Sequence, residues 1–128
     1  MVYTVTTTAN IDTIKQEFEA KAKNIGFEIF NIGDFKRILT DKGFPIKKEI
    51  TVFELCNPSG AQQELDYLPE ISVYLPSKIS LYQKNGVTTL TTIGLEEIVA
   101  KFDIDERFKA YMAILFDNLK QLMHSWDK

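Results

Sequence analysis

The residue of this sequence best suited to chemistry is its one cysteine, Cys56, which stands directly before Asn57 and Pro58. Asparagine caps the open amides of a helix and proline suits the first helical position, so this pair predicts a helix start. A thiol at the positive end of a helix dipole has a lowered pKa and a more reactive thiolate. The alternative interpretation is structural, because free cysteine is among the most buried residue types and behaves as a small apolar side chain.

Ser77 and Lys78, which follow Pro76, supply further polar groups. If this segment meets Cys56 and Asn57, the four side chains form one rim of a pocket, since pockets combine apolar walls with a few convergent polar groups. Lys78 then favours a small anionic or carbonyl-bearing ligand. Its alternative role is that of a surface lysine after a proline bend. The expected apolar walls come from the last helix, at Tyr111, Leu115 and Leu119.

Two further titratable residues are Glu54 and His124. Alternation along a strand puts Glu54 on the same face as Cys56, among apolar neighbours. There it is a proton acceptor with a raised pKa, a salt-bridge partner of a lysine such as Lys78, or a residue at a sheet edge open to water. His124 stands near the end of the final helix, where we expect fraying. One cysteine and one histidine fall short of the three or four ligands of a zinc site, so we expect no metal site.

The sequence contains none of the motifs G-x-G-x-x-G, P-loop, H-E-x-x-H, G-x-S-x-G or C-x-x-C. Standard nucleotide-binding and hydrolase mechanisms are therefore not indicated, and no cofactor is expected. The six glycines are spaced as turn residues and not as a phosphate cradle. Most of the nine phenylalanines and five tyrosines occupy predicted core positions, where aromatic burial is the usual outcome.

The elements that must position these residues begin with a strand over residues 2–7 and a helix that Asn10 caps. The helix shows a single apolar stripe, formed by Ile11, Ile14, Phe18, Ala22 and Ile25. Residues 27–32 predict a strand covered on both faces, because apolar residues stand on both sides of the alternation. A short helix capped by Asp34 follows, and residues 50–56 predict the strand that ends at Cys56.

Residues 79–82 and 87–93 flank Asn85-Gly86, the dipeptide that best suits a type I′ turn, and therefore predict a hairpin with Leu81 facing Leu90. Near the C-terminus, Asp103 and Glu106 have the spacing of a capping-box relative before a long apolar stripe. The order is strand, helix, four further strands and helix, with two or three short helices inserted. This order predicts an α+β fold with a mostly antiparallel sheet and both long helices on one face.

Length and charge restrict the class of protein. The 128 residues suit one domain, over residues 1–128, and a net charge of −3 argues against nucleic acid as a partner. The single cysteine, and an N-terminus with neither a basic start nor a long apolar core, predict a cytoplasmic protein. No apolar stretch approaches the roughly 20 residues that cross a bilayer, so we expect no membrane span.

Four short segments together carry a resemblance to a known family: Gly26-Phe27, Cys56-Asn57-Pro58, Leu75-Pro76-Ser77-Lys78, and Tyr82 with Asn85-Gly86. Over most of its length the chain resembles the bacterial and archaeal family catalogued as domain of unknown function 302. The resemblance implies a strand-helix-four strands-helix fold, similar to the TATA-binding-protein and helix-grip group, and members that look like dimers. It implies no established activity. The family commonly has glycine where Cys56 stands, so the resemblance implies no role for this thiol.

Two functional hypotheses follow from these observations. The first is a non-catalytic small-ligand-binding or accessory domain that acts as a homodimer, since an open sheet leaves strand edges unpaired. The second is a small thiol-dependent enzyme or redox protein that uses Cys56. The state of this thiol distinguishes the two hypotheses, because a reactive thiolate is exposed and acidic.

Overall fold

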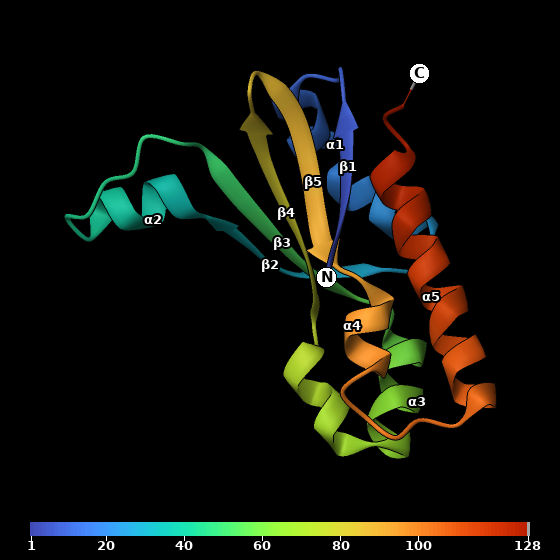
Figure 1. Cartoon of the computed structure of the whole chain (residues 1–128). Coiled ribbons are helices and arrows are strands. Elements are labelled where there is room, and N and C mark those ends of the chain that lie inside the picture. The colour runs from blue at the N-terminus through green and yellow to red at the C-terminus, as the bar shows by residue number, and fades with distance from the viewer. Residues whose placement is uncertain (128) are drawn as a thin grey trace.

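The computed structural model describes residues 1–127 and contains a five-stranded sheet in the order β1-β5-β4-β3-β2. Every neighbouring pair of strands is antiparallel, as expected for this α+β fold (Figure 1). The elements, in chain order, are β1 (Val2–Thr7), α1 (Ile11–Asn24), β2 (Glu28–Asp34), α2 (Phe35–Asp41), β3 (Ile50–Cys56), α3 (Pro58–Tyr67), the 3₁₀ helix η1 (Pro69–Tyr74), β4 (Ser77–Lys84), β5 (Val87–Ile93), α4 (Leu95–Val99) and α5 (Glu106–His124).

The two long helices, α1 and α5, pack on the same face of the sheet, as predicted (Figure 1). Alternate strand residues point to this face, because side chains of a strand alternate between its two sides. An aromatic stack joins the layers: the Phe18 ring of α1 lies 3.8 Å from the Phe53 ring of β3, with 11° between their planes. The ring of Trp126, just after α5, is also stacked with that of Phe18, at 6.0 Å. The main core therefore ties together β3, α1 and the C-terminal segment.

The local signals in the sequence form the elements that they predicted. The side chain of Asn10 accepts a hydrogen bond from the amide of Asp12, and this contact caps α1. Asn85 and Gly86 have positive φ angles of 53° and 77°, as a type I′ turn requires, and Leu81 lies opposite Leu90. The hairpin prediction is confirmed, including its register.

Two local expectations are wrong. The strand β2 is not covered on both faces, since Phe30 and Ile32 on it are 63% and 48% exposed. It lies at the edge of the sheet and pairs with β3. The cap of α5 is Asp105 and not Asp103, since the Asp105 side chain accepts the amide hydrogen bond of Phe108. Two acidic residues of the right type stand two positions apart, and only the backbone geometry distinguishes them.

The short elements lie at opposite ends of the central strands. The helices α3, η1 and α4 form a small lobe at one end of the sheet, with a second apolar cluster around Ile71, Ile104 and Met112. The helix α2 precedes β3 in the sequence and projects away from the body of the molecule (Figure 1). None of the residues of α2 is buried. The lobe positions the candidate site, whereas α2 takes no part in it.

Candidate functional site

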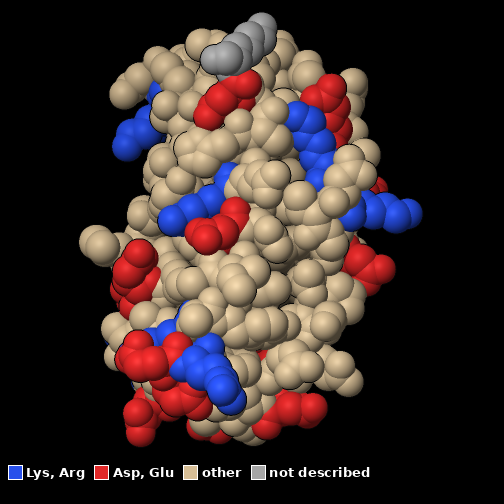
Figure 2. Space-filling model, turned by 90° about the vertical axis from the view of Figure 1, so that its right-hand side faces the viewer, with Lys and Arg blue, Asp and Glu red and all other residues tan. Residues whose placement is uncertain are grey.

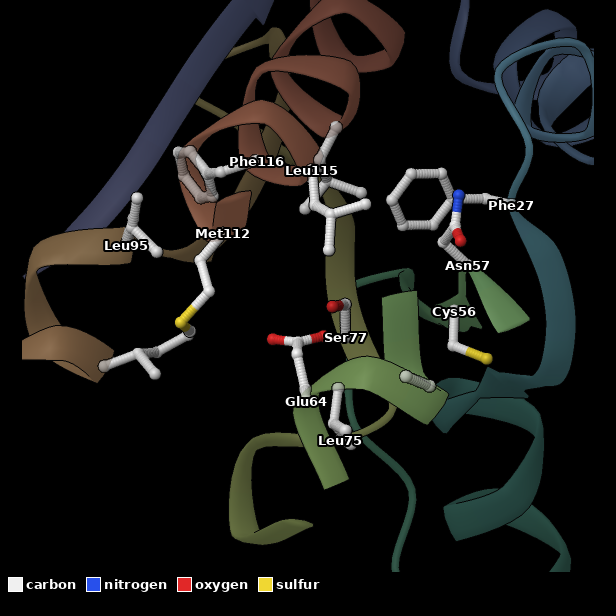
Figure 3. Close-up of a pocket in the computed structure, with 13 residues that line it drawn as sticks. Phe27, Cys56, Asn57, Glu64, Leu75, Ser77, Leu95, Met112, Leu115 and Phe116 are labelled. Carbon is white, nitrogen blue, oxygen red and sulfur yellow. The ribbon is translucent and has the colours of Figure 1, made fainter. Parts of the chain in front are cut away.

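A pocket of about 60 Å³ lies where the lobe meets the sheet and α5 (Figure 3). Its polar side chains are Cys56, Asn57, Glu64 and Ser77, which come from the end of β3, from α3 and its cap, and from the start of β4. Its apolar walls are formed by Phe27, Ala61, Leu75, Leu95, Ile98, Met112, Leu115, Phe116 and Leu119. The two polar segments meet because β3 and β4 are neighbours, with Leu55 opposite Ser77.

Glu64 is the residue of this pocket with the most distinctive chemistry. Burial raises the pKa of Glu64 to about 7, from an ordinary value of 4.5. In Figure 3 the Glu64 carboxyl and the Ser77 hydroxyl point into the same part of the pocket. No hydrogen bond joins either group to another residue within 1–127. At neutral pH the carboxyl is present in both forms, so it can donate a hydrogen bond when protonated and accept one when ionised.

Glu64 was not among the residues predicted to form the site, although the sequence contains a signal for it. Asn57 predicts the start of α3, and Gly60 and Ala61, which stand four and three residues before Glu64, then lie on the same side of that helix as Glu64. The small side chains at positions 60 and 61 allow another element to pack closely beside Glu64. The sequence does not show what this face packs against, and the structure shows that it is α5.

Gly60 is not a turn residue, contrary to the expectation for the glycines. It lies within α3, and a Cβ atom at this position would lie 2.7 Å from Cδ1 of Leu115 on α5. The missing side chain lets α3 approach α5 closely, and this approach forms one wall of the pocket. The expectation failed because a glycine that packs against another helix has no distinct local sequence signature.

Cys56 lines the pocket, but its environment is the opposite of that of a reactive thiol. Its side chain is only 6% exposed. Burial, and then the nearby carboxylates of Glu28 and Glu64, raise the pKa of the thiol, whereas the hypothesis of a reactive thiol required the start of α3 to lower it. In Figure 3 the sulfur points away from Glu64 and Ser77. Desolvation and negative charge outweigh the helix dipole here, so the structural interpretation of this cysteine is favoured.

We expect Cys56 in the folded protein to react with iodoacetamide at pH 7 at least about tenfold more slowly than in urea, because both burial and protonation suppress thiolate attack. Mass spectrometry of samples taken over time measures the rate. Cys56→Ser, which lacks the thiol, gives the background from other nucleophiles. Equal rates in the folded and the unfolded protein would contradict the assignment of Cys56 as a buried, protonated thiol.

Part of the Asn57 side chain is used in a helix cap. Its Oδ1 accepts a hydrogen bond of 2.8 Å from the amide of Gly60, so it caps α3 as predicted. Its Nδ2 lies against Gly26, 3.1 Å from the point where a Cβ would stand. Asn57 therefore contributes to the shape of the pocket, and Glu64 and Ser77 remain as its free polar groups among residues 1–127.

Lys78 and Tyr111 do not line this pocket, unlike the other predicted residues. Lys78 is exposed and lines a neighbouring hollow of about 320 Å³, which shares Ser77 and Phe116 with the pocket. The Tyr111 ring lies beside that of Phe108, at 5.6 Å. Successive residues of a strand point to opposite faces, which separates Lys78 from Ser77. Tyr111 was predicted to form part of the pocket wall, but the next residue, Met112, lines the pocket instead.

The other titratable candidates, Glu54 and His124, lie outside the pocket. Glu54 is half-buried on the sheet face opposite the long helices, and Lys78 is its cross-strand neighbour, without an ion pair between them in residues 1–127. His124 is not at a frayed end: its Nε2 lies 2.6 Å from the Tyr3 hydroxyl, and its Nδ1 lies 2.8 Å from Asp127. Across residues 1–127, no group of three or more potential ligands could hold a metal ion.

The fold and the site together define an α+β domain with a small pocket at one end of an antiparallel sheet. The sequence model of the family described as "Domain of unknown function DUF302" matches residues 3–125. The chain therefore belongs to this family, as its motifs indicated.

One solved structure supports the fold independently. It is described as the crystal structure of an uncharacterized conserved protein DUF302 from Bacillus stearothermophilus. The two chains share 24% sequence identity, and the superposition has a TM-score of 0.85 and covers 95% of this chain and 94% of the other. A comparison with curated proteins finds no match. Among the helices of residues 1–127, none combines the length and the apolar character needed to cross a membrane.

Proposed function

We propose that this chain is a single, non-catalytic domain that binds a small carbonyl-bearing molecule in the pocket between α3, α4, α5 and the sheet. The observation that carries the proposal is the free pair of Glu64 and Ser77 among apolar walls. A protonated carboxyl and a hydroxyl are both donors to a carbonyl oxygen, and the walls suit a compact apolar remainder. The volume of about 60 Å³ is the share of about two water molecules and is well below the roughly 300 Å³ of an ordinary ligand pocket, so the ligand proposed here has only a few heavy atoms.

An anionic ligand has weaker support than a carbonyl-bearing one. The cation that suggested an anion, Lys78, does not line the pocket, and Glu64, which does, is a carboxyl group. An anion beside Glu64 would oppose the ionised form of this side chain. A neutral carbonyl compound meets no such repulsion.

The rival function, a thiol-dependent enzyme or redox protein, requires an exposed and acidic thiol. Cys56 is buried and the pKa of its thiol is raised. These two observations favour the binding function over the thiol chemistry.

The test is a thermal-shift screen with a panel of small aldehydes, ketones, amides and carboxylates, preceded by native mass spectrometry of the protein as isolated. A bound compound at a hundred times its Kd should add about 2.7 kcal/mol to the free energy of unfolding. We expect carbonyl compounds to raise the melting temperature, and Ser77→Ala and Glu64→Leu to reduce this response.

The matched controls are Ser59→Ala, on the exposed side of α3, and Glu106→Leu, at the exposed start of α5. Both make the same chemical change outside the pocket and should keep the wild-type response. The proposal fails if no compound shifts the melt and none co-purifies, or if the pocket variants and the controls respond alike.

We also propose that the domain acts as a homodimer in the cytoplasm. Support for the dimer comes from the two edge strands of the open sheet, β1 and β2, since an unpaired edge is a ready surface for association. Support for the cytoplasm comes from the single cysteine, which has no second cysteine in the chain with which to form a disulfide.

A further inference from the structure

One surface segment packs little against the rest of the chain. We call it the arm and define it as residues 35–48, which comprise α2 and the loop that leads to β3. No residue of α2 is buried, and Figure 1 shows α2 standing off from the body of the molecule. Phe35, Ile38 and Phe44 are exposed on it, and Phe44 is exposed to 74%. A projecting segment that exposes several large apolar side chains is typical of an interaction surface.

The arm is also strongly basic. It contains five cations and one carboxylate, Asp41. The cations are Lys36, Arg37, Lys42, Lys47 and Lys48. All five are exposed, and no ion pair forms between them and any other residue of the part of the chain that the structure describes. The arm therefore offers an apolar surface with unpaired positive charge around it.

The lobe carries the complementary charge. We define the acidic lobe as residues 58–76 and 95–106, which contain eight carboxylates and one cation, Lys101. Asp66, Glu70 and Asp103 are exposed, and acidic side chains gather at this end of the molecule in Figure 2. The acidic lobe also exposes apolar side chains, at Leu65 and Val73.

The arm and the acidic lobe of one chain lie apart. The arm precedes β3 in the sequence, and α3 of the acidic lobe follows β3. The arm and the acidic lobe therefore lie at opposite ends of this strand (Figure 1). Their opposite charges can be satisfied between two copies, each of which offers one arm and one lobe. A two-fold pairing uses both contacts and closes the assembly.

We propose that the arm of one copy docks on the acidic lobe of a second copy, in a reciprocal homodimer. This inference rests on the homodimer proposed above and names its interface. Contact between two arms is disfavoured, because each arm carries five cations against one carboxylate and like charges oppose association. Contact between arm and lobe brings together opposite charges and exposed apolar side chains.

Two charge-reversed proteins test the pairing. The arm variant carries Lys36→Glu, Arg37→Glu and Lys42→Glu, which leaves two cations and four carboxylates on the arm. The lobe variant carries Asp66→Lys, Glu70→Lys, Glu96→Lys and Asp103→Lys, which leaves four carboxylates and five cations on the acidic lobe. All seven positions are exposed, so the fold should be kept. Light scattering over a concentration series should show wild type at twice the 14.7 kDa chain mass and each variant alone with a dimer Kd raised about 100-fold.

Mixing the two variants is the decisive measurement. In the mixture each arm meets a lobe of opposite charge at both contacts, so a heterodimer with wild-type affinity should form. Recovery of the dimer also shows that both variants are folded. The single substitution Phe44→Ser should weaken the wild-type dimer about tenfold or more, because it removes an exposed apolar anchor.

The outcomes separate this inference from the homodimer itself. Wild type at 14.7 kDa at every concentration would overturn both the homodimer and its interface. A wild-type dimer that the arm and lobe variants leave unchanged would overturn the interface alone. A lobe variant that dimerises normally, together with a weakened arm variant that mixing does not rescue, would also overturn it, in favour of contact between two arms.

Discussion

Replacing Phe53 by alanine is expected to lower the free energy of unfolding by about 3–5 kcal/mol, the range for a large buried aromatic side chain. Phe53 is only 2% exposed, and its ring stacks on Phe18 at 3.8 Å. Truncation leaves a cavity between β3 and α1 and also removes the support for Phe18, on which Trp126 stacks. This loss is large against the roughly 5–15 kcal/mol that stabilises a typical domain.

The measurement is urea unfolding followed by the fluorescence of Trp126, the only tryptophan, which reports directly on this stack. The matched control is Phe30→Ala on the edge strand β2, where the ring is 63% exposed and the expected change is below about 1 kcal/mol. A loss below about 1 kcal/mol for Phe53→Ala would show that the stack does not carry the main core.

The second large effect concerns the pH dependence of stability at Glu64. The pKa of Glu64 is about 7 in the folded protein, whereas the ordinary value of 4.5 applies to the unfolded chain. The folded protein therefore binds this proton more tightly than the unfolded chain does. The stabilising contribution is complete below about pH 4.5 and is lost as the pH rises through about 7. Stability from this residue therefore falls between pH 4 and pH 8.

The magnitude follows from the size of the pKa difference. At 1.36 kcal/mol for each pKa unit, the difference between 4.5 and about 7 corresponds to about 3 kcal/mol. Glu64 is only half-buried, and solvent screening reduces this figure, so we expect about 1–2 kcal/mol.

Glu64→Gln tests this, because glutamine keeps the shape and does not titrate. The free energy of unfolding of the variant, measured in urea at pH 4 to 8, should rise relative to wild type by about 1–2 kcal/mol over this range. Glu106→Gln makes the same change where the side chain is 92% exposed, and its profile should run parallel to that of wild type. A parallel profile for Glu64→Gln as well would mean that Glu64 is not held in a desolvated pocket.

Most of the elements could be predicted because their signals are local. Asn10 and Asn57 cap helices with their own side chains, and Asn85-Gly86 adopts the positive φ angles of its turn. The hairpin register followed from this turn, because a two-residue loop leaves one pairing of the flanking strands. The placement of α1 and α5 on one face followed from the order of the elements, in which the long helices stand at opposite ends of the sequence and the strands form a mostly antiparallel sheet.

Part of the candidate site could be anticipated in the same way. Cys56, Asn57 and Ser77 line one pocket, as expected if their two segments meet. The prediction that the α5 residues Leu115 and Leu119 form its wall is also confirmed. Cys56, Asn57 and Ser77 could be predicted because each stands at the end or the start of an element that the sequence marks clearly. Leu115 and Leu119 could be predicted because they belong to the apolar stripe of α5.

By itself, the sequence determined the α+β class, the order of the strands and the two long helices, the hairpin and the family, since each depends on short-range patterns or on motifs. Only the tertiary structure decided three other features: the exposure of β2, the place of Gly60 against Leu115, and the raised pKa of Glu64. Each depends on which distant segment packs nearby. Strand order left β2 at an edge, and the approach of α3 to α5 removed water from Glu64. Desolvation and close contact are properties of the packed chain, and a single position in the sequence carries neither.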